Sequence, residues 1–273
     1  MLYFQRMDML VRCALTEPMW QRLKRQEGAL LAIVASTLFF MGTALQTLVT
    51  LTALTLLTLS TLYLFNDLTD CIEDQNNPRK DQRYVSTLIE YRSRYWVWLA
   101  LQKLLVLGLA WNQAGTEGAC VVLAVFLINT SYSLKLKGIP YIDVIWVGLW
   151  GAAITAMAGL NQPIASFILV GIMTAISHIY QVRLDAPVDN NHNVKTSAVL
   201  SHQTTEIQIM ALCLGFGAIL VQSNLSWLSI SAFAPWILGK YLKSNHAWVL
   251  ARYYFGIIWL CYLESVYGRL AQF

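Results

Sequence analysis

Long apolar stretches alternate with short polar connections along almost the whole chain. A helix needs about 20 mostly apolar residues to cross the hydrocarbon core of a bilayer, and these stretches approach that length. Gly, Asn, Pro and Gln mark the junctions, for example at Gly115 and at residues 161–163. The pattern predicts nine transmembrane helices, at about residues 29–47, 49–65, 95–112, 118–133, 141–159, 163–181, 207–222, 226–239 and 247–265.

The chain is expected to form one domain over residues 1–273, because no fixed-period repeat or low-complexity linker divides it. Residues 1–27 are polar and basic, and they are expected to form an amphipathic segment before the first span. The fold class predicted from the pattern is therefore an all-α integral membrane protein, with membrane lipid as one of its partners.

Composition supports the same interpretation. Hydrophobic residues make up 57% of the chain and charged residues only 12%, against about 25% charged in a typical soluble domain. This excludes a soluble globular enzyme, a disordered chain and a nucleic-acid-binding domain, and the net charge of +4 is too small to favour nucleic acid as a partner. The five cysteines form no C-x-x-C pair, so a metal or disulfide site is not predicted from them.

Most of the 19 Lys and Arg residues fall on alternate connections between the predicted spans. They precede the first span, follow the second, fourth and sixth, and flank the junction of the eighth and ninth; the exceptions are Lys103 and Arg269. The positive-inside rule assigns this face to the cytoplasm. We therefore expect a multi-pass protein with its N-terminus in the cytoplasm and its C-terminus outside.

A first acidic cluster follows the second predicted span on this face. Asp67, Asp70 and Asp74 are spaced i, i+3, i+7, which places them on one side of a helix. Carboxylates so placed repel one another and favour a bound cation, and oxygen ligands at a membrane edge suit Mg²⁺. Basic residues that suit phosphate come directly afterwards, at Arg79, Lys80 and Arg83.

A second acidic pair, Asp185 and Asp189, follows the sixth span on the same predicted face. The i, i+4 spacing again suits one helical side, although Pro187 lies between the two residues. A single such pair is more often a solvated loop. Two clusters with basic neighbours, beside an apolar bundle, instead predict a metal-bridged diphosphate that carries a lipid tail.

At these residues the sequence resembles the UbiA superfamily of intramembrane prenyltransferases, of the 4-hydroxybenzoate polyprenyltransferase type. Residues 66–74 fit the family's N-D-x-x-D-x-x-x-D motif, and Asp185 and Asp189 fit its D-x-x-x-D motif. Residues 195–200 and 132–137 resemble the family's K-[ST]-[ST]-A-[VI]-L and Tyr-plus-basic segments. The chain departs from the pattern after the first motif, where Tyr84 replaces a common proline, and at Asn193, where glycine is usual.

The resemblance implies nine helices around a lipid-accessible cavity with a cytoplasmic polar cap. It also implies Mg²⁺ as cofactor, an isoprenyl diphosphate and a small aromatic or lipid-like acceptor as substrates, and an allylic cation between them. The implied metal ligands are Asp67, Asp70, Asp74, Asp185 and Asp189, of which Asp67, Asp70, Asp185 and Asp189 are also the implied catalytic residues. The implied diphosphate-binding residues are Asn66, Arg79, Arg83, Tyr132, Lys137 and Lys195, and Arg22 is a candidate for the acceptor.

Several alternatives remain open at this stage. The same metal site would suit a membrane terpene cyclase, and residues 77–80 resemble the branch that transfers phosphoribose to a polyprenyl phosphate. A transporter is disfavoured, because the charged clusters lie at one face and only Lys103 and His178 approach mid-membrane. For His178 a simple hydrogen bond is the preferred interpretation, and for Asp143 a place at a helix N-terminus.

Overall fold

The computed structural model describes residues 16–24, 28–77, 80–191 and 195–268, and within these ranges the chain is helical without any β-strand. The α-helices are α2 (Glu17–Lys24), α3 (Ala29–Phe40), α4 (Leu45–Asp70), α5 (Gln82–Glu90), α6 (Arg92–Ser131), α7 (Ile142–Thr155), α8 (Ile164–Asn191), α9 (Ser197–Leu200), α10 (His202–Gln222), α11 (Ala234–Tyr241) and α12 (Ser244–Tyr267). Shorter 3₁₀ segments cover Glu73–Asn76, Ala156–Ala158 and Ser226–Phe233, and a π-helix covers Tyr132–Leu136.

The predicted apolar stretches lie mainly in helical structure, but the first, 29–47, is interrupted after Phe40 and its last residues belong to α4. Five described segments are long and apolar enough to cross a membrane, and they fall in α4, α6, α8, α10 and α12. Large apolar side chains such as Leu104, Ile164 and Ile230 are exposed on the outside, as expected of a surface that contacts lipid rather than water. The chain is thus an integral membrane protein. The count of nine crossings and the orientation of the termini stay predictions.

Helix α6 is a hairpin of two antiparallel arms, although it is continuous in its residue range. Trp96 packs edge-on against Phe65, whereas Asn129 donates to the neighbouring Asn66, so both ends of α6 meet the same part of α4. On one straight helix, residues 96 and 129 would be about 50 Å apart. The chain turns at Gly115, whose φ of 60° and ψ of −149° lie in a region that only glycine adopts readily. The two arms correspond to the third and fourth predicted spans.

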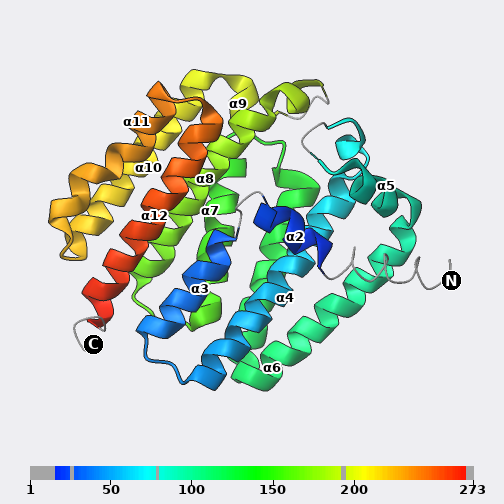
Figure 1. The fold of residues 1–273 in the computed structure, drawn as a ribbon, viewed down its shortest axis with the longest axis horizontal. Coiled ribbons are helices and arrows are strands. Elements are labelled where there is room, and N and C mark those ends of the chain that lie inside the picture. The colour runs from blue at the N-terminus through cyan, green and yellow to red at the C-terminus, as the bar shows by residue number, and fades with distance from the viewer. Residues whose placement is uncertain (1–15, 25–27, 78–79, 192–194, 269–273) are drawn as a thin grey trace.

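Small residues set the position of α8 against α7. A Cβ atom added at Gly148 would lie 3.2 Å from the carbonyl oxygen of Gly171, and one added at Gly171 would lie 3.1 Å from that of Gly148. At Gly151 an added Cβ would collide with the side chain of Thr174. Because glycine has no side chain at these positions, the two helix backbones can approach closely, as small residues allow within a membrane. In Figure 1 the acidic ends of α4 and α8 point to the same side of the bundle, near α5 and α9.

Candidate active site

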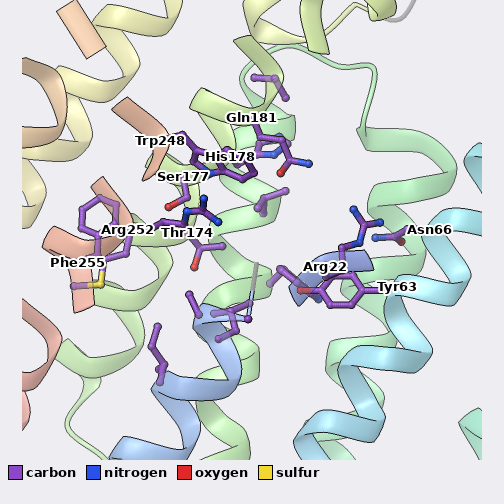
Figure 2. Close-up of a pocket in the computed structure, with 18 of the residues that line it drawn as sticks. Arg22, Tyr63, Asn66, Thr174, Ser177, His178, Gln181, Trp248, Arg252 and Phe255 are labelled. Atoms are coloured by element: carbon purple, nitrogen blue, oxygen red, sulfur yellow. The ribbon is translucent and has the colours of Figure 1, made fainter. Parts of the chain in front are cut away.

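A cavity of about 910 Å³ lies inside the bundle, between α2, α3 and α4 on one side and α7, α8 and α12 on the other. Figure 2 shows Arg22 and Asn66 on one wall, with His178 and Trp248 across from them. Exposed residues of α3 and α12, among them Ala32 and Ile257, also line the cavity. The cavity therefore reaches the molecular surface beside these two helices, as expected of the lipid-accessible cavity that the family resemblance implied.

The end of α4 presents one polar face to this cavity. Asn66, Asp70, Glu73 and Asp74 line it, at relative positions i, i+4, i+7 and i+8. Successive residues of a helix are rotated by about 100° about its axis. Asp67 therefore points in a different direction from Asn66 and does not line the cavity. The cavity-facing stripe is thus shifted from the predicted set of Asp67, Asp70 and Asp74: it contains Asn66 in place of Asp67.

Asp67 is a buried carboxylate that connects three helices. It accepts hydrogen bonds from Arg22 Nη2 of α2 at 2.7 Å and from the Tyr84 hydroxyl of α5 at 3.1 Å. The guanidinium of Arg22 also lies 4.9 Å from the centre of the Tyr63 ring. Arg22 is therefore held at the cavity wall by Asp67, and α2 is fastened to α4 by a buried ion pair.

Lysines pair with the two cavity-facing aspartates. Lys137 Nζ lies 2.7 Å from Asp70 Oδ2, and Lys80 Nζ lies 2.8 Å from Asp74 Oδ2. Burial acts to lower the pKa of Lys137, but the charge of Asp70 and its hydrogen bond outweigh burial, so this pKa lies above its ordinary value. Lys137 directly follows the π-helix, a distortion that often marks functional sites. Both lysines line the cavity and present positive charge there.

Asn66 is oriented from the neighbouring arm of α6 and from the π-helix. Its side-chain oxygen accepts from Asn129 Nδ2 at 3.0 Å and from Ser133 Oγ at 2.7 Å. Both partners act as donors to this oxygen. They hold the amide at the edge of the same polar stripe as Asp70.

The second motif lies on α8, which continues through Pro187. Asp185 and Asp189 line the cavity across from the end of α4. Burial raises the pKa of Asp189 to about 6; the positive charge of Lys137 opposes this shift, while the charge of Asp185 adds to it. Among the described residues, none forms a hydrogen bond or ion pair with Asp189. The second motif therefore contains a carboxylate whose ionised form is disfavoured by burial in the metal-free protein.

Tyr132 and His178 form a pair in the cavity wall. The Tyr132 hydroxyl lies 3.4 Å from His178 Nε2, and the rings meet edge to face with centroids 5.9 Å apart. Both residues line the cavity. The structure thus places Tyr132 in the cavity wall, and it places His178 there as well as in a hydrogen bond.

The segment after the second motif is tied to the start of α7. Asp143 is fully buried and accepts from Ser197 Oγ at 2.8 Å and from Ser197 N at 3.3 Å. Asp143 thus binds a segment 54 residues away in addition to lying in the first turn of its helix. The preceding residue, Thr196, is 1% exposed and lines the cavity, and its Oγ1 has no hydrogen-bond partner among the described residues. The sequence did not predict Thr196 and Ser197 as site residues. Their one signal was their place in residues 195–200, which resemble the family's K-[ST]-[ST]-A-[VI]-L segment.

The remaining predicted residues are not all placed at the cavity. Arg83 and Lys195 are exposed and do not line it. Arg79 lies outside the described residues. Lys80, one of the basic residues that follow the first motif, is brought into the site by its ion pair with Asp74. The family-derived roles of Arg83 and Lys195 stay predictions.

The oxygen ligands at the polar end suit a magnesium ion by their chemistry. Carboxylates of α4 and α8 and the amide oxygen of Asn66 line one cavity, and such hard ligands are the ones Mg²⁺ prefers. Within the described ranges, no three His, Cys, Asp or Glu side chains converge closely enough to hold a metal. Lys137 and Lys80 instead balance the charges of Asp70 and Asp74. The residues fit the ion, provided that these side chains rearrange when it binds.

Comparison with known proteins gives two positive results. The model of the UbiA prenyltransferase family matches residues 28–256. A UbiA homolog from Archaeoglobus fulgidus bound to DMAPP and Mg²⁺ superposes with a TM-score of 0.70 at 18% identity, covering 94% of this chain and 99% of that chain. The same homolog bound to GPP and Mg²⁺ gives 0.67 at 18% identity, covering 89% and 96%. At this identity the structures establish a shared fold, and no curated protein sequence matches significantly.

Proposed function

This chain belongs to the UbiA prenyltransferase family, and we propose that it transfers an isoprenyl group from a prenyl diphosphate to an aromatic or quinone-precursor acceptor. The observation that carries the proposal is the single cavity in which the two acidic motifs face each other. Asp70 and Asp74 lie on one wall and Asp185 and Asp189 lie on the other, while many apolar side chains, such as Ile33 and Met173, line other parts of the same cavity. A diphosphate head and an isoprenoid tail require this division of polar and apolar surface.

The proposed Mg²⁺ ligands are Asn66, Asp70, Asp74, Asp185 and Asp189. When bound, the ion neutralises the diphosphate and makes it a better leaving group. Asp67 is proposed to position Arg22 rather than to contact the metal directly, since its two oxygens accept hydrogen bonds from Arg22 and Tyr84 and it does not line the cavity itself.

Lys80 and Lys137 are proposed to move from the carboxylates to the diphosphate once the carboxylates bind metal. Both already line the cavity, and their ammonium groups are phosphate donors. Tyr132 presents an aromatic ring in the cavity wall, which would stabilise the positive charge left on the allylic group when the carbon–oxygen bond breaks. The apolar walls exclude water from that cation, and acceptor attack on its C1 completes transfer.

The test is release of pyrophosphate and formation of prenylated product by the purified protein, with Mg²⁺ and geranyl, farnesyl or geranylgeranyl diphosphate. Each donor is tested with and without hydroxybenzoate-type and hydroxynaphthoate-type acceptors. We expect Asp70→Asn and Asp185→Asn each to lower turnover by more than about 10³-fold, since each removes a carboxylate that stabilises the transition state through the ion.

The matched control is Glu117→Gln, which removes an exposed carboxylate from α6 and should leave turnover unchanged. Release of pyrophosphate that needs no acceptor, with a cyclic hydrocarbon as product, would replace transfer by cyclisation. Wild-type turnover that persists in both Asp variants would refute the proposed site.

A further inference from the structure

One face of α8 carries a continuous polar stripe from the deep part of the cavity to its acidic end. Thr174, His178, Gln181, Asp185 and Asp189 follow one another at intervals of three or four residues, and all five line the cavity. The interval of seven residues from His178 to Asp185 corresponds to two turns, or about 10 Å along the helix. His178 therefore lies below the proposed diphosphate site, on the side where the isoprenoid tail and the acceptor must lie.

His178 is the single histidine among the described residues that line the cavity. The carboxylates that line it lie at the ends of α4 and α8, where the proposed metal is bound. The lysine and arginine side chains at the wall are protonated and cannot accept a proton. The imidazole is thus the ionisable base placed on the hydrocarbon side of the metal site.

The contact with Tyr132 distinguishes the two ring nitrogens of His178, because only Nε2 takes part in it. Tyr132 Oη lies 3.4 Å from His178 Nε2 and either partner can donate. If Nε2 carries the hydrogen and donates to Tyr132 Oη, then Nδ1 keeps a free lone pair. The hydrogen bond would then select the tautomer and fix the ring, as second partners of catalytic histidines commonly do.

Transfer to an aromatic carbon requires such a base. The C1–O bond of the donor breaks and its electron pair stays with the diphosphate. A ring carbon of the acceptor then forms a bond to C1, which leaves that carbon with one hydrogen too many and the ring positively charged. Loss of this proton restores the aromatic ring, with the C–H electron pair returning to it.

We propose that His178 is the catalytic base that removes this proton from a phenolic acceptor, taking it on Nδ1 while Tyr132 orients the ring through Nε2. The proposal rests on the proposed function, because it assigns the acceptor half of that reaction. The imidazolium that forms returns its proton to water when the product leaves. No oxidant, reductant or further reactant is needed.

The experiment compares wild type with His178→Gln, which keeps a polar side chain of similar size but cannot take up a proton. The reaction contains geranyl diphosphate, Mg²⁺ and 4-hydroxybenzoate or a hydroxynaphthoate. Prenylated acceptor and free geraniol are quantified by mass spectrometry, and binding of geranyl thiolodiphosphate with Mg²⁺ is measured separately. We expect product formation to fall by about 10²-fold, geraniol to rise relative to product, and the Kd of the thiolodiphosphate to stay within twofold.

Three further variants separate chemistry from structure. His202→Gln removes an exposed histidine of α10 and should behave as wild type. His178→Ala should regain part of its transfer activity on addition of free imidazole, which a structural role would not produce. Tyr132→Phe keeps the aromatic ring and should lower transfer less than His178→Gln does.

The outcomes are decisive. Product formation within threefold of wild type in His178→Gln would overturn the proposal and leave the departing diphosphate as the base. Parallel loss of thiolodiphosphate binding would also overturn it, since His178 would then act on the donor site. A loss in Tyr132→Phe as large as that in His178→Gln would remove the assignment to Nδ1. Wild-type protein that ionises the donor but prenylates no acceptor would refute the proposed function and this proposal together.

Discussion

The two acidic motifs face the same cavity but differ in how the resting protein treats their charges. In the first motif, Asp67 is bonded to Arg22, Asp70 to Lys137 and Asp74 to Lys80. In the second motif, Asp189 has no such partner among the described residues, and burial raises its pKa to about 6. The first motif therefore contributes to the stability of the metal-free fold, whereas the second contains a charge that opposes it.

This difference suggests an order of events when metal and diphosphate bind. The lysines hold the first motif in place before the ion arrives, so that site is organised by the protein itself. Asp189 of the second motif has no bonded counter-charge among the described residues, so a bound ion would supply one. A metal that bridges the two motifs would thus lock α8 onto a preformed α4 platform.

The largest effect should come from breaking the internal ion pair of the first motif. Asp67→Ala removes the buried carboxylate to which Arg22, itself 7% exposed, donates at 2.7 Å. Removing one partner of a buried pair costs about 3 kcal/mol or more. We expect the free energy of unfolding, measured in mixed micelles by denaturant titration, to fall by about that amount.

The control for Asp67→Ala is the double variant with Arg22→Ala. If the ion pair is the cause, the double variant should lose less stability than the sum of the two single variants. Additive losses would show that Asp67 and Arg22 stabilise the protein independently. The ion pair between Asp67 and Arg22 would then not account for the stability of the first motif.

The sequence predicted the helices well because their cause is local. Within a bilayer, a run of apolar residues long enough to span it forms a helix, because lipid offers no hydrogen-bond partners and the backbone groups must be satisfied internally. The turn at Gly115 was marked in the same way, by a residue whose conformation requires glycine. The positions of Asp70, Asp74, Asp185 and Asp189 at one cavity also followed from helical spacing together with the alternation of basic connections.

Helical spacing could not show that Asn66, rather than Asp67, lines the cavity. The spacings 66, 70, 74 and 67, 70, 74 both describe an acceptable helical stripe. In the structure Asn66 lines the cavity, whereas Asp67 is bonded to Arg22 of α2 and Tyr84 of α5. Likewise, Asp143 bonds Ser197 across 54 residues. Contacts between distant segments decide which polar residue faces the cavity, and no local pattern contains them.

A second prediction compares the threonines beside the two motifs. Thr69 Oγ1 donates to Asn66 O at 2.8 Å, whereas Thr196 Oγ1 is buried at the cavity without a partner among the described residues. A hydrogen bond to a charged group contributes about 1.5–3 kcal/mol. If Thr196 donates to the diphosphate, Thr196→Val should raise the KM for prenyl diphosphate about tenfold, which corresponds to about 1.4 kcal/mol.

The matched variant Thr69→Val should change that KM by less than twofold, because its hydroxyl is satisfied within its own helix. Thr196→Ser should restore wild-type behaviour, since it returns the hydroxyl. If Thr196→Val and Thr69→Val behave alike in steady-state kinetics, the unsatisfied hydroxyl of the second region has no part in donor binding.

The smallest effect, on the melting temperature of the metal-free protein, gives the sharpest contrast between the motifs. The folded pKa of Asp189 is raised from 3.8 to about 6, so the folded state holds this proton more tightly than the unfolded chain does. The stabilisation is complete below pH 3.8 and is lost as the pH rises through 6. In EDTA, Asp189→Asn should therefore melt about 2 °C above wild type at pH 7.5, and this gap should close as the pH falls to 4.

Asp70→Asn should instead melt below wild type at pH 7.5, because Lys137 loses its partner. Thermal scans at pH 7.5, 6 and 4 check both signs; if both variants shift the melting temperature in the same direction, the two motifs do not differ in the way the structure indicates.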